Sequence, residues 1–422
     1  MCKLEEYGNC DEETKDQEYC IFHKPNKNEE EAREFYEKFL RRFRPKKERI
    51  TLEEIERERF VFEETVDCRG YVFPEIPKDM EFSFVYSVFK GNAGFDRATF
   101  KGDAWFFRVT FEGDAWFFRA IFEGDAVFLE ATFEGDAVFG ETTFEGFAWF
   151  GEATFEGDAV FDRATFKGDT WFEGATFEGY AQFGGATFEG IVTFKGKRKD
   201  SKYKFYGKLG FSNTEFRKGV LIDIPSEWFK LPSAKAEAYR VQRISYEREG
   251  KKDDADRMFV RERRALREAK VEKAKDDVEK TKEELKRFID SQKAEGIKAK
   301  LKSLFKLIKA IGNYLLAEFG SFLEFLLADW TCEYGTNWRR PVILWMLFVF
   351  LVFPLLYFIL GGITKVSSPL DYLYFSVVTA TTFGYGDLQP IGWCRLVASM
   401  EAIFGTFMWA VFLVVFARKY MR

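Results

Sequence analysis

A phenylalanine recurs every eleven residues through the middle of the chain, in two interleaved series. The first series runs from Phe100 to Phe188 and the second from Phe95 to Phe194, so the strides between neighbouring Phe residues alternate between five and six. A small residue usually stands two places before each Phe, and a Gly stands two places after each Phe of the first series. Neither the helical period nor the alternation of a strand fits this spacing, whereas a stack of short coils does.

In such a solenoid each short extended segment points one Phe inward, glycines turn the corners, and the coils stack at about 4.8 Å. The unit A-T-F-E-G-D-A-V-F resembles the repeat of the pentapeptide-repeat family, whose fold is a right-handed quadrilateral β-helix. Every second stride carries one extra residue here, so we expect coils of about 22 residues or a regular bulge. Less regularly spaced Phe residues on both sides of the two series extend the predicted solenoid over residues 61–220.

Charge divides the soluble part of the chain. Residues 91–196 hold nineteen Asp or Glu but only seven Lys or Arg, which makes the surface of the predicted solenoid acidic. Residues 230–310 reverse the balance, with 25 basic and 16 acidic residues, and their composition predicts helices with a break at Gly250. We predict a helical connector over residues 230–337. Ahead of the solenoid we predict a helical linker over residues 31–60, starting with an amphipathic helix over residues 31–44.

The predicted connector ends in a basic amphipathic segment. Over residues 297–327 the apolar residues fall on one helical stripe and the lysines lie away from it, a pattern typical of a helix at a membrane surface. Residues 311–330 are also apolar enough to form a third membrane span, which would place the solenoid outside the cell. Glu318, Glu324 and the lysine-rich start favour the interfacial helix.

Two segments near the C-terminus are long enough to cross a bilayer, which takes about 20 apolar residues. The first runs over residues 341–360, directly after Arg339 and Arg340, and the second covers residues 393–416, before Arg418 and Lys419. Both basic flanks lie on the same side of the membrane, which the positive-inside rule assigns to the cytosol. The segment between the two spans is therefore outside or re-entrant.

A seven-residue motif lies between the two spans and consists of Thr381, Thr382, Phe383, Gly384, Tyr385, Gly386 and Asp387. Backbone carbonyls that replace the hydration shell of a cation must all point at one axis, and glycine adopts the unusual backbone angles that this requires. The motif resembles the potassium-channel filter T-x-G-Y-G, in which Val usually stands at the place of Phe383. The resemblance implies that Thr382–Gly386 bind K⁺, flanked by Thr381 and Asp387, in a ring of four chains.

The residues around the motif predict a pore helix. Ser368, Pro369 and Asp371 form a helix start, with a cap, a proline at the first position and an acid three residues after the cap. A helix over residues 369–381 directs its negative end toward the channel axis, which favours a cation there. Together with the two spans, this resembles a two-transmembrane potassium-channel pore domain over residues 338–422.

Two residues of the second span stand out. By the same resemblance, Gly405 corresponds to the hinge glycine of the inner helix, where bending opens a cytosolic gate; a small residue for close helix packing is an equally good interpretation. Glu401 is an acid within the membrane, and such acids face protein or water. We expect it to be buried behind the filter.

A cluster of cysteines marks residues 1–30 as a separate module. Three of the six cysteines and the single histidine lie here, and Cys2, Cys10, Cys20 and His23 supply three thiolates and one imidazole, which suit tetrahedral, structural Zn²⁺. A metal would hold together a module too short to fold on burial alone. We interpret the other three cysteines, Cys68, Cys332 and Cys394, as small apolar residues.

These features predict a multidomain membrane protein with a pentapeptide-repeat β-helix, an α-helical connector and an α-helical two-transmembrane pore domain with a re-entrant pore loop. The predicted function is a homotetrameric potassium channel of the cell membrane. The N-terminus carries no secretory signal, so the N-terminal domains and the C-terminus are expected in the cytosol. The solenoid would serve assembly or regulation, through a ligand or partner that the sequence leaves open.

Two alternatives are a weakly selective cation channel and a membrane-anchored acidic binding scaffold. The filter motif favours a channel over the scaffold, because an anchor does not need it. With one histidine, no nucleophile elbow and no phosphate-binding loop, nothing in the sequence indicates an enzyme, and no nucleic-acid partner is expected.

Overall fold

The computed structural model describes residues 2–52, 55–195, 205–223, 226–290 and 297–420. It divides into two compact units, Met1–Ala265 and Leu266–Arg422.

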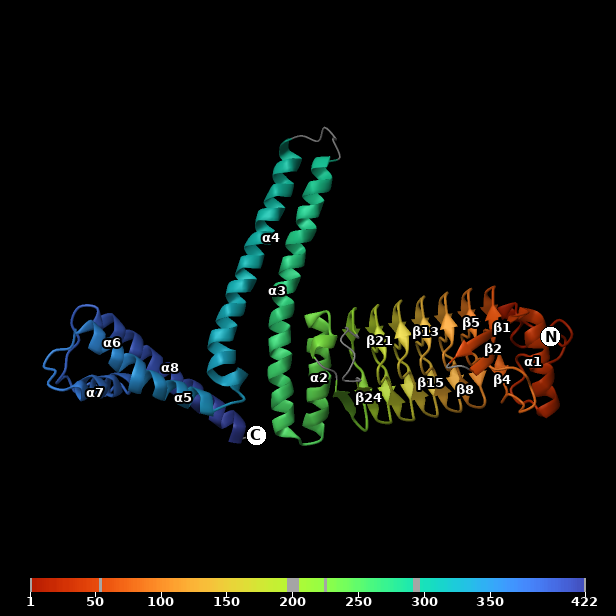
Figure 1. The fold of residues 1–422 in the computed structure, drawn as a ribbon, viewed down its shortest axis with the longest axis horizontal. Coiled ribbons are helices and arrows are strands. Elements are labelled where there is room, and N and C mark those ends of the chain that lie inside the picture. The colour runs from red at the N-terminus through yellow and green to blue at the C-terminus, as the bar shows by residue number, and fades with distance from the viewer. Residues whose placement is uncertain (1, 53–54, 196–204, 224–225, 291–296, 421–422) are drawn as a thin grey trace. The chain divides into compact units, whose positions relative to one another are not determined.

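The first unit contains a solenoid of four sheets built from short strands, stacked coil upon coil (Figure 1). Sheet A holds β1 (Lys46–Leu52), β2 (Ile55–Phe62), β5 (Val88–Phe89), β9 (Thr110–Phe111), β13 (Thr132–Phe133), β17 (Thr154–Phe155) and β21 (Thr176–Phe177). Sheet B holds β3 (Val66–Asp67), β6 (Ala93–Gly94), β10 (Ala115–Trp116), β14 (Ala137–Val138), β18 (Ala159–Val160), β22 (Ala181–Gln182) and β25 (Leu209–Gly210).

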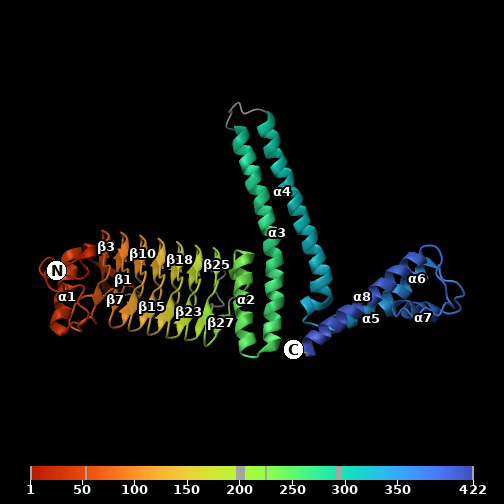
Figure 2. The same cartoon turned by 180° about the vertical axis from the view of Figure 1, so that it is seen from behind.

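The two remaining sheets follow the same pattern. Sheet C holds β4 (Val72–Phe73), β7 (Thr99–Phe100), β11 (Ile121–Phe122), β15 (Thr143–Phe144), β19 (Thr165–Phe166), β23 (Thr187–Phe188) and β26 (Glu215–Phe216). Sheet D holds β8 (Ala104–Trp105), β12 (Ala126–Val127), β16 (Ala148–Trp149), β20 (Thr170–Trp171), β24 (Val192–Lys195) and β27 (Val220–Asp223). Figure 2 shows the stack from behind, with strands of sheets B and C labelled.

The register of the sheets confirms the predicted coil of 22 residues. Phe111 pairs with Phe133 and Phe133 with Phe155, in parallel. The inward rings stack in the same register; those of Phe122 and Phe144 lie 5.0 Å apart between centroids. The Phe side chains of both series and the small residues two places before most of them are buried in one continuous core. Burial of aromatic surface is therefore what holds successive coils together.

The corners of the coils are of two kinds. In the six-residue strides a Gly and an Asp form a bend, and the Asp carboxylate accepts the backbone N–H of the residue 22 places later, as Asp103 does from Asp125 at 2.9 Å. A Cβ on Gly124 would lie 2.6 Å from the carbonyl carbon of Gly102, so this position requires glycine. At corners of this kind the extra residue of the long stride supplies a hydrogen-bond acceptor for the next coil.

The corners of the five-residue strides differ from the prediction that glycines turn every corner. Seven consecutive corners place Arg or Glu in the left-handed region, with φ from 51° to 58°, at Arg97, Arg108, Arg119, Glu130, Glu141, Glu152 and Arg163. Each such residue costs about 1 kcal/mol of backbone strain. The strained corners are also linked to one another. Ion pairs join successive corners, such as Arg108 with Glu130 at 2.7 Å, and backbone hydrogen bonds join each corner to the next coil.

An N-terminal cap covers the first coil. It consists of the 3-10 turn η1 (Glu5–Tyr7), helix α1 (Glu29–Phe43), which starts with a capping box of Asn28 and Glu31, and the loop between them. The apolar side of α1 joins the solenoid core, as predicted for an amphipathic helix. From Lys46, however, the chain forms the antiparallel hairpin β1–β2, so the predicted helical linker over residues 31–60 is wrong in its second half. The hairpin joins sheet A through β5.

Helix α2 (Pro232–Arg248), preceded by the 3-10 turn η2 (Ser226–Trp228), covers the last coil. Side chains of α2 bond to open backbone groups of this coil: Gln242 accepts from the N–H of Ile222, Ser245 accepts from the N–H of Val220, and Arg248 donates to Phe216 O at 2.8 Å. These three residues recur every third position and so share one helix face.

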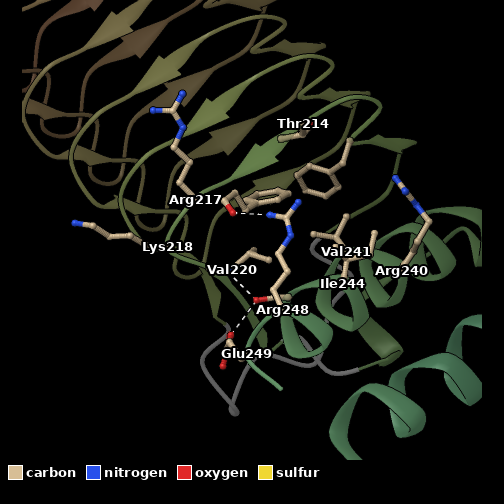
Figure 3. A pocket seen from close by; sticks show the side chains of 13 residues that line it. Thr214, Arg217, Lys218, Val220, Arg240, Val241, Ile244, Arg248 and Glu249 are labelled. Atoms are coloured by element: carbon tan, nitrogen blue, oxygen red, sulfur yellow. Dashed lines mark hydrogen bonds between the residues drawn. The ribbon is translucent and has the colours of Figure 1, made fainter. Parts of the chain in front are cut away.

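A pocket of about 240 Å³ remains beside this contact. Figure 3 shows that, of its basic side chains, Arg248 crosses the floor while Arg217, Lys218 and Arg240 point outward. Arg217 and Arg240 are engaged with Glu189 and Glu237. The pocket is therefore part of the joint between α2 and the solenoid.

Gly250, with φ 73°, separates α2 from helix α3 (Lys252–Asp290), as predicted. Helix α4 (Ile297–Glu324) runs into a π-helical turn, η3 (Phe325–Trp330), and a 3-10 turn, η4 (Glu333–Gly335). An ion pair between Arg267 and Asp329, at 3.2 Å, joins α3 to this region. Many apolar side chains of α4 are exposed, among them Phe305, Leu315, Leu316 and Phe319.

The rest of the second unit is formed by α5 (Arg339–Leu347), the π-helical segment η5 (Phe348–Val352), α6 (Phe353–Leu360), α7 (Pro369–Ala380) and α8 (Cys394–Tyr420). Among the described residues three helical stretches are long and apolar enough to cross a membrane, and they cover Leu301–Trp330, Arg339–Leu360 and Cys394–Tyr420. The last two agree with the predicted spans. The first keeps open the alternative of a third span.

Candidate ion pathway and metal centre

Helix α7 lies between the two C-terminal spans and leads into the filter motif. Its start is capped as predicted: the Ser368 hydroxyl accepts from the N–H of Leu370 at 3.3 Å, and the Asp371 carboxylate accepts from the N–H groups of Ser367 and Ser368 at 2.6 and 2.8 Å. These bonds hold the pKa of Asp371 below its usual range. Since α7 ends at Ala380, its carbonyl end faces directly into the motif.

The backbone of the motif alternates between two conformations. Thr382, Gly384 and Gly386 have φ of 60°, 56° and 79°, whereas Phe383 and Tyr385 between them are not in the left-handed region. Such alternation lets successive carbonyls point the same way, which an extended strand does not allow. Phe383 and Tyr385 are 72% and 70% exposed, and their rings stack with centroids 6.3 Å apart.

Glu401 lies where α6, α7 and α8 meet, and it is completely buried, as expected for an acid in a span. The Tyr357 hydroxyl of α6 donates to its carboxyl group at 2.5 Å, and the Ser376 hydroxyl of α7 contacts its other oxygen. Ser376 Oγ also lies 2.7 Å from Val349 O. Glu401 thereby links the pore helix to both spans. Neither Tyr357 nor Ser376 was predicted from the sequence, although a buried acid is normally accompanied by polar partners.

Gly405 is the point of closest approach between α8 and the end of α7. A Cβ at this position would lie 2.2 Å from Ala380 O. An alanine would therefore fit here only if α7 or α8 moved. This contact supports the packing interpretation of Gly405. The contact does not decide between packing and a hinge, because a glycine that packs closely also has no side chain to oppose bending of α8.

The four predicted metal ligands come together in the N-terminal cap. One ligand atom each from Cys2, Cys10, Cys20 and His23 lies within 4.8 Å of all the others. The three Sγ atoms are 3.5, 3.6 and 3.0 Å from His23 Nδ1. A tetrahedron with Zn–S of 2.3 Å and Zn–N of 2.0–2.1 Å has S···N edges of about 3.5 Å, so the donor set fits the ion.

The surroundings of His23 suit a metal ligand. Its other ring nitrogen, Nε2, lies 3.4 Å from Arg69 O in the first coil, and this bond orients the ring. Burial lowers the pKa of His23 to about 4, which keeps the imidazole neutral. Burial also raises the pKa of Cys20, so a cation is needed to hold this thiol as thiolate.

The cluster is built into the end of the solenoid. Phe22, between two of the ligands, accepts the N–H of Val72 at 2.8 Å and so covers the open edge of β4. The Phe22 ring stacks on Tyr71 with centroids 4.5 Å apart, and the Tyr71 hydroxyl donates to Asn9 O at 2.9 Å. Residues 2–30, predicted as a separate module, therefore form part of the solenoid cap. Cys68 is buried nearby but belongs to the core.

Family models match two parts of the chain. The model described as pentapeptide repeats (9 copies) matches residues 84–128, 117–164 and 152–196, and the model described as ion channel matches residues 335–422. No curated protein and no solved structure matches the chain. The coils of four sheets and the helix–motif–helix arrangement agree with these two families. The chain thus joins a pentapeptide-repeat β-solenoid to a C-terminal ion-channel domain of the two-transmembrane type.

Proposed function

We propose that this protein is a potassium-selective channel in which four chains surround one pore. The observation that carries the proposal is the alternating backbone of Thr382, Gly384 and Gly386, placed between two candidate spans directly after a capped helix. A dehydrated cation needs a column of carbonyl oxygens, and this backbone supplies one such column per chain. Tyr385 and both glycines of the potassium signature are present, which favours K⁺ over a weakly selective pore.

The exposure of the filter side chains supports assembly of several copies. In a single chain Phe383 and Tyr385 are largely uncovered, whereas aromatic side chains of this size are normally packed. In a homotetramer, neighbouring copies and lipid cover these rings, and the carbonyl columns of the four chains face one another across the axis.

The remaining parts take supporting roles in the proposal. The basic residues Arg339, Arg340, Arg418 and Lys419 support a cytosolic side for these ends of both spans in a cell-membrane protein. In the proposal the solenoid lies on the same side, because α4 does not cross the membrane. Helix α4, with its exposed apolar residues and lysines, lies at the lipid surface. Zn²⁺ at Cys2, Cys10, Cys20 and His23 is structural, since the four protein ligands fill its coordination shell. The solenoid is an assembly or regulatory module.

A flux assay tests the proposal. The purified full chain, reconstituted into liposomes, should dissipate a K⁺ gradient but not a Na⁺ gradient. Gly386→Ala should abolish the flux, because it removes a left-handed glycine at the filter, while Gly312→Ala in α4, where a Cβ meets no atom within 4 Å, should preserve it.

The two alternatives predict other results. Equal permeability to both ions identifies a weakly selective cation channel. Absence of flux from a particle that is correctly inserted and tetrameric identifies a membrane-anchored scaffold and overturns the channel proposal. Particle images of the full chain should show fourfold symmetry around residues 382–386.

A further inference from the structure

Tyr334 in the turn η4 is held at both of its ends by arginines from two different helices. The guanidinium group of Arg267 on α3 donates to the Tyr334 hydroxyl at 3.0 Å. The guanidinium group of Arg418, in the last turn of α8, donates to the Tyr334 backbone carbonyl at 2.9 Å. All three residues belong to the second unit, so one buried tyrosine there connects α3 to the C-terminal end of α8.

The connection on the side of α3 is firmly fixed. Arg267 also donates to the Asp329 carboxylate at 3.2 Å, and its guanidinium group lies 5.4 Å from the centroid of the Phe325 ring. The side chains of Arg267 and Asp329 are only 14% and 4% exposed. A guanidinium group that is bound to a buried carboxylate keeps a defined position, since its departure would leave that charge unpaired. A shift of α3 at Arg267 must therefore either carry Tyr334 along or break the bond to its hydroxyl.

The connection on the other side reaches the ends of two helices of the ion-channel domain. A Cβ on Gly335 would lie 3.2 Å from Nη1 of Arg418, so the glycine allows this close approach of α8 to η4. Glu333, the first residue of η4, forms an ion pair at 2.5 Å with Arg340 in the first turn of α5. The turn η4 thus contacts both α5 and α8 at their basic ends. A change in the conformation of η4 therefore acts on both helices.

The backbone of η4 depends on such contacts. Glu333, Tyr334 and Gly335 have φ of 47°, 53° and 80°, so three consecutive residues lie in the left-handed region. Residues with a Cβ avoid this region and keep it only where their surroundings enforce it. The bonds from the three arginines of α3, α5 and α8 contribute to that enforcement. Loss of the bond from α3 therefore favours another arrangement of the turn, and an element with two arrangements is what coupling between distant parts of a protein requires.

Helix α3 also leads back to the solenoid. It is continuous from Lys252 to Asp290. In the first unit its Glu262 pairs with Arg243 of α2 at 2.8 Å, and both side chains are largely buried. Helix α2 is in turn bonded to the last coil through the three side chains described above. A continuous series of helices and polar contacts thus leads from the last coil, through α2 and α3, to Tyr334.

We propose that Tyr334 couples α3 to the pore: when α3 moves, the bond from Arg267 changes, η4 rearranges, and the C-terminal end of α8 shifts between a closed and an open position. This inference rests on the proposed function, in which the C-terminal ends of four α8 helices surround the cytosolic mouth of the pore. It deepens that function by naming the route along which a ligand or partner of the solenoid reaches the pore. Such a ligand changes channel opening only if it binds more tightly to one of the two positions of α3.

A structural brace is the alternative role for Tyr334. A brace contributes to the stability of the folded domain, and its loss lowers the midpoint of thermal unfolding without changing the balance between pore states. A coupling residue changes the balance between two folded states, so its loss alters how long the pore stays open. The two roles are therefore separated by measuring pore opening, conductance and thermal stability on the same protein.

Single-channel recording on the full chain in planar bilayers, with K⁺ on both sides, tests the proposal. Tyr334→Phe removes the hydroxyl but keeps the ring and the backbone carbonyl that Arg418 contacts. It should change the ratio of open to closed time about tenfold, because a hydrogen bond to a charged group contributes a factor of that order to an equilibrium. The single-channel conductance should stay that of the parent, since the filter is untouched.

The matched control is a second tyrosine whose hydroxyl makes a local bond. The hydroxyl of Tyr314 on α4 donates to Glu318 of the same helix at 2.8 Å. Tyr314→Phe removes a hydroxyl as Tyr334→Phe does, but without touching η4. It should leave both the open-to-closed ratio and the conductance unchanged.

A second variant and two double variants test the route itself. Arg267→Lys keeps a positive charge beside Asp329 but lacks the second arm that reaches Tyr334. It should shift the ratio in the same direction as Tyr334→Phe, and the two changes combined should shift it no further, because both remove one bond. Glu262→Gln, which breaks the ion pair between α3 and α2, should alter the ratio in the parent chain and have little effect in Tyr334→Phe.

The other outcomes overturn the proposal in distinguishable ways. A parent chain that conducts K⁺, with a ratio unchanged by Tyr334→Phe and Arg267→Lys, overturns the coupling while the channel proposal stands; a lower thermal midpoint then identifies a brace. Shifts that multiply in either double variant show that the residues act separately and also overturn it. A changed conductance places the effect at the filter and likewise contradicts the coupling. Absence of K⁺ current from a correctly inserted, tetrameric parent overturns the proposed function on which the coupling rests.

Discussion

Tyr357 in α6 donates a 2.5 Å hydrogen bond to Glu401 in α8, with both side chains completely buried. Ser376 completes the group, and its hydroxyl, which has a single hydrogen, faces two acceptors, Glu401 and Val349 O. When Ser376 donates to Val349 O, Glu401 must itself be a donor, that is, a neutral carboxylic acid. A neutral acid at this point joins three helices without placing a charge in the membrane interior.

This arrangement makes Glu401→Gln and Glu401→Ala behave differently. The amide of Gln can both donate and accept, so Glu401→Gln should keep the midpoint of thermal unfolding in detergent close to that of the parent. Glu401→Ala leaves the buried hydroxyl of Tyr357 without its acceptor, while Ser376 keeps Val349 O, and the loss should cost about 1–3 kcal/mol. If the carboxylate is charged and needed as such, the Gln variant will be as unstable as the Ala variant.

Gly405→Ala should disturb the pore helix. The new Cβ has no room beside Ala380 O, so α8 must move away from the end of α7, and K⁺ flux into liposomes should fall sharply. Gly320→Ala in α4, where a Cβ meets no atom within 4 Å, is the control and should leave the flux unchanged. Normal flux from Gly405→Ala would contradict the close packing of α7 and α8.

Removal of the metal should loosen the N-terminal cap. The purified chain should contain one Zn²⁺ per subunit by elemental analysis, and Cys20→Ser should lose it while Cys68→Ala, which changes a buried cysteine outside the cluster, should keep it. Because the thiols must give up their protons to bind zinc, the affinity should fall as the pH is lowered. Chelation should increase amide hydrogen exchange at Val72, whose N–H is bonded to Phe22 O; unchanged exchange would show that the cap holds without metal.

Two buried threonines of the solenoid should respond in opposite ways to replacement by valine. Thr170 is completely buried in β20, and its hydroxyl has no hydrogen-bond partner within the described part of the chain. Thr170→Val should therefore raise the free energy of unfolding by about 1 kcal/mol. Thr142 is equally buried but donates to Phe117 O at 2.5 Å, so Thr142→Val should lower it. Denaturant unfolding of the full chain, followed by circular dichroism in the β region, measures both.

The sequence allowed prediction of those parts in which one local pattern decides the structure. The eleven-residue Phe spacing, together with the resemblance to a four-sided repeat, predicted coils of about 22 residues or a regular bulge, and the pairing of Phe122 with Phe144 confirms the 22-residue coil. The filter motif and the cap at Ser368 are contiguous and were recognisable for the same reason. The four metal ligands could be found because cysteine and histidine are otherwise scarce in the chain.

What escaped prediction depends on contacts between distant segments. The hairpin of β1 and β2 has the charged composition of a helix, and it becomes strand through its pairing with β5. The positive φ at Arg97 and its equivalents follows from backbone bonds to the next coil, such as that from Arg97 N to Phe118 O. Similarly, Tyr357 and Ser376 gain a role only once three helices place them around Glu401.

The pairing of each residue with the one 22 positions later has a consequence for how such a chain can change in length. Duplication of a single eleven-residue unit would turn everything downstream by half a circuit, so the tryptophans beyond it would move to the opposite wall and α2 would meet the wrong strands. Gain or loss of two units leaves every later residue on its original wall. Viable descendants of this protein should therefore differ from it by even numbers of units, a parity rule that follows from geometry alone.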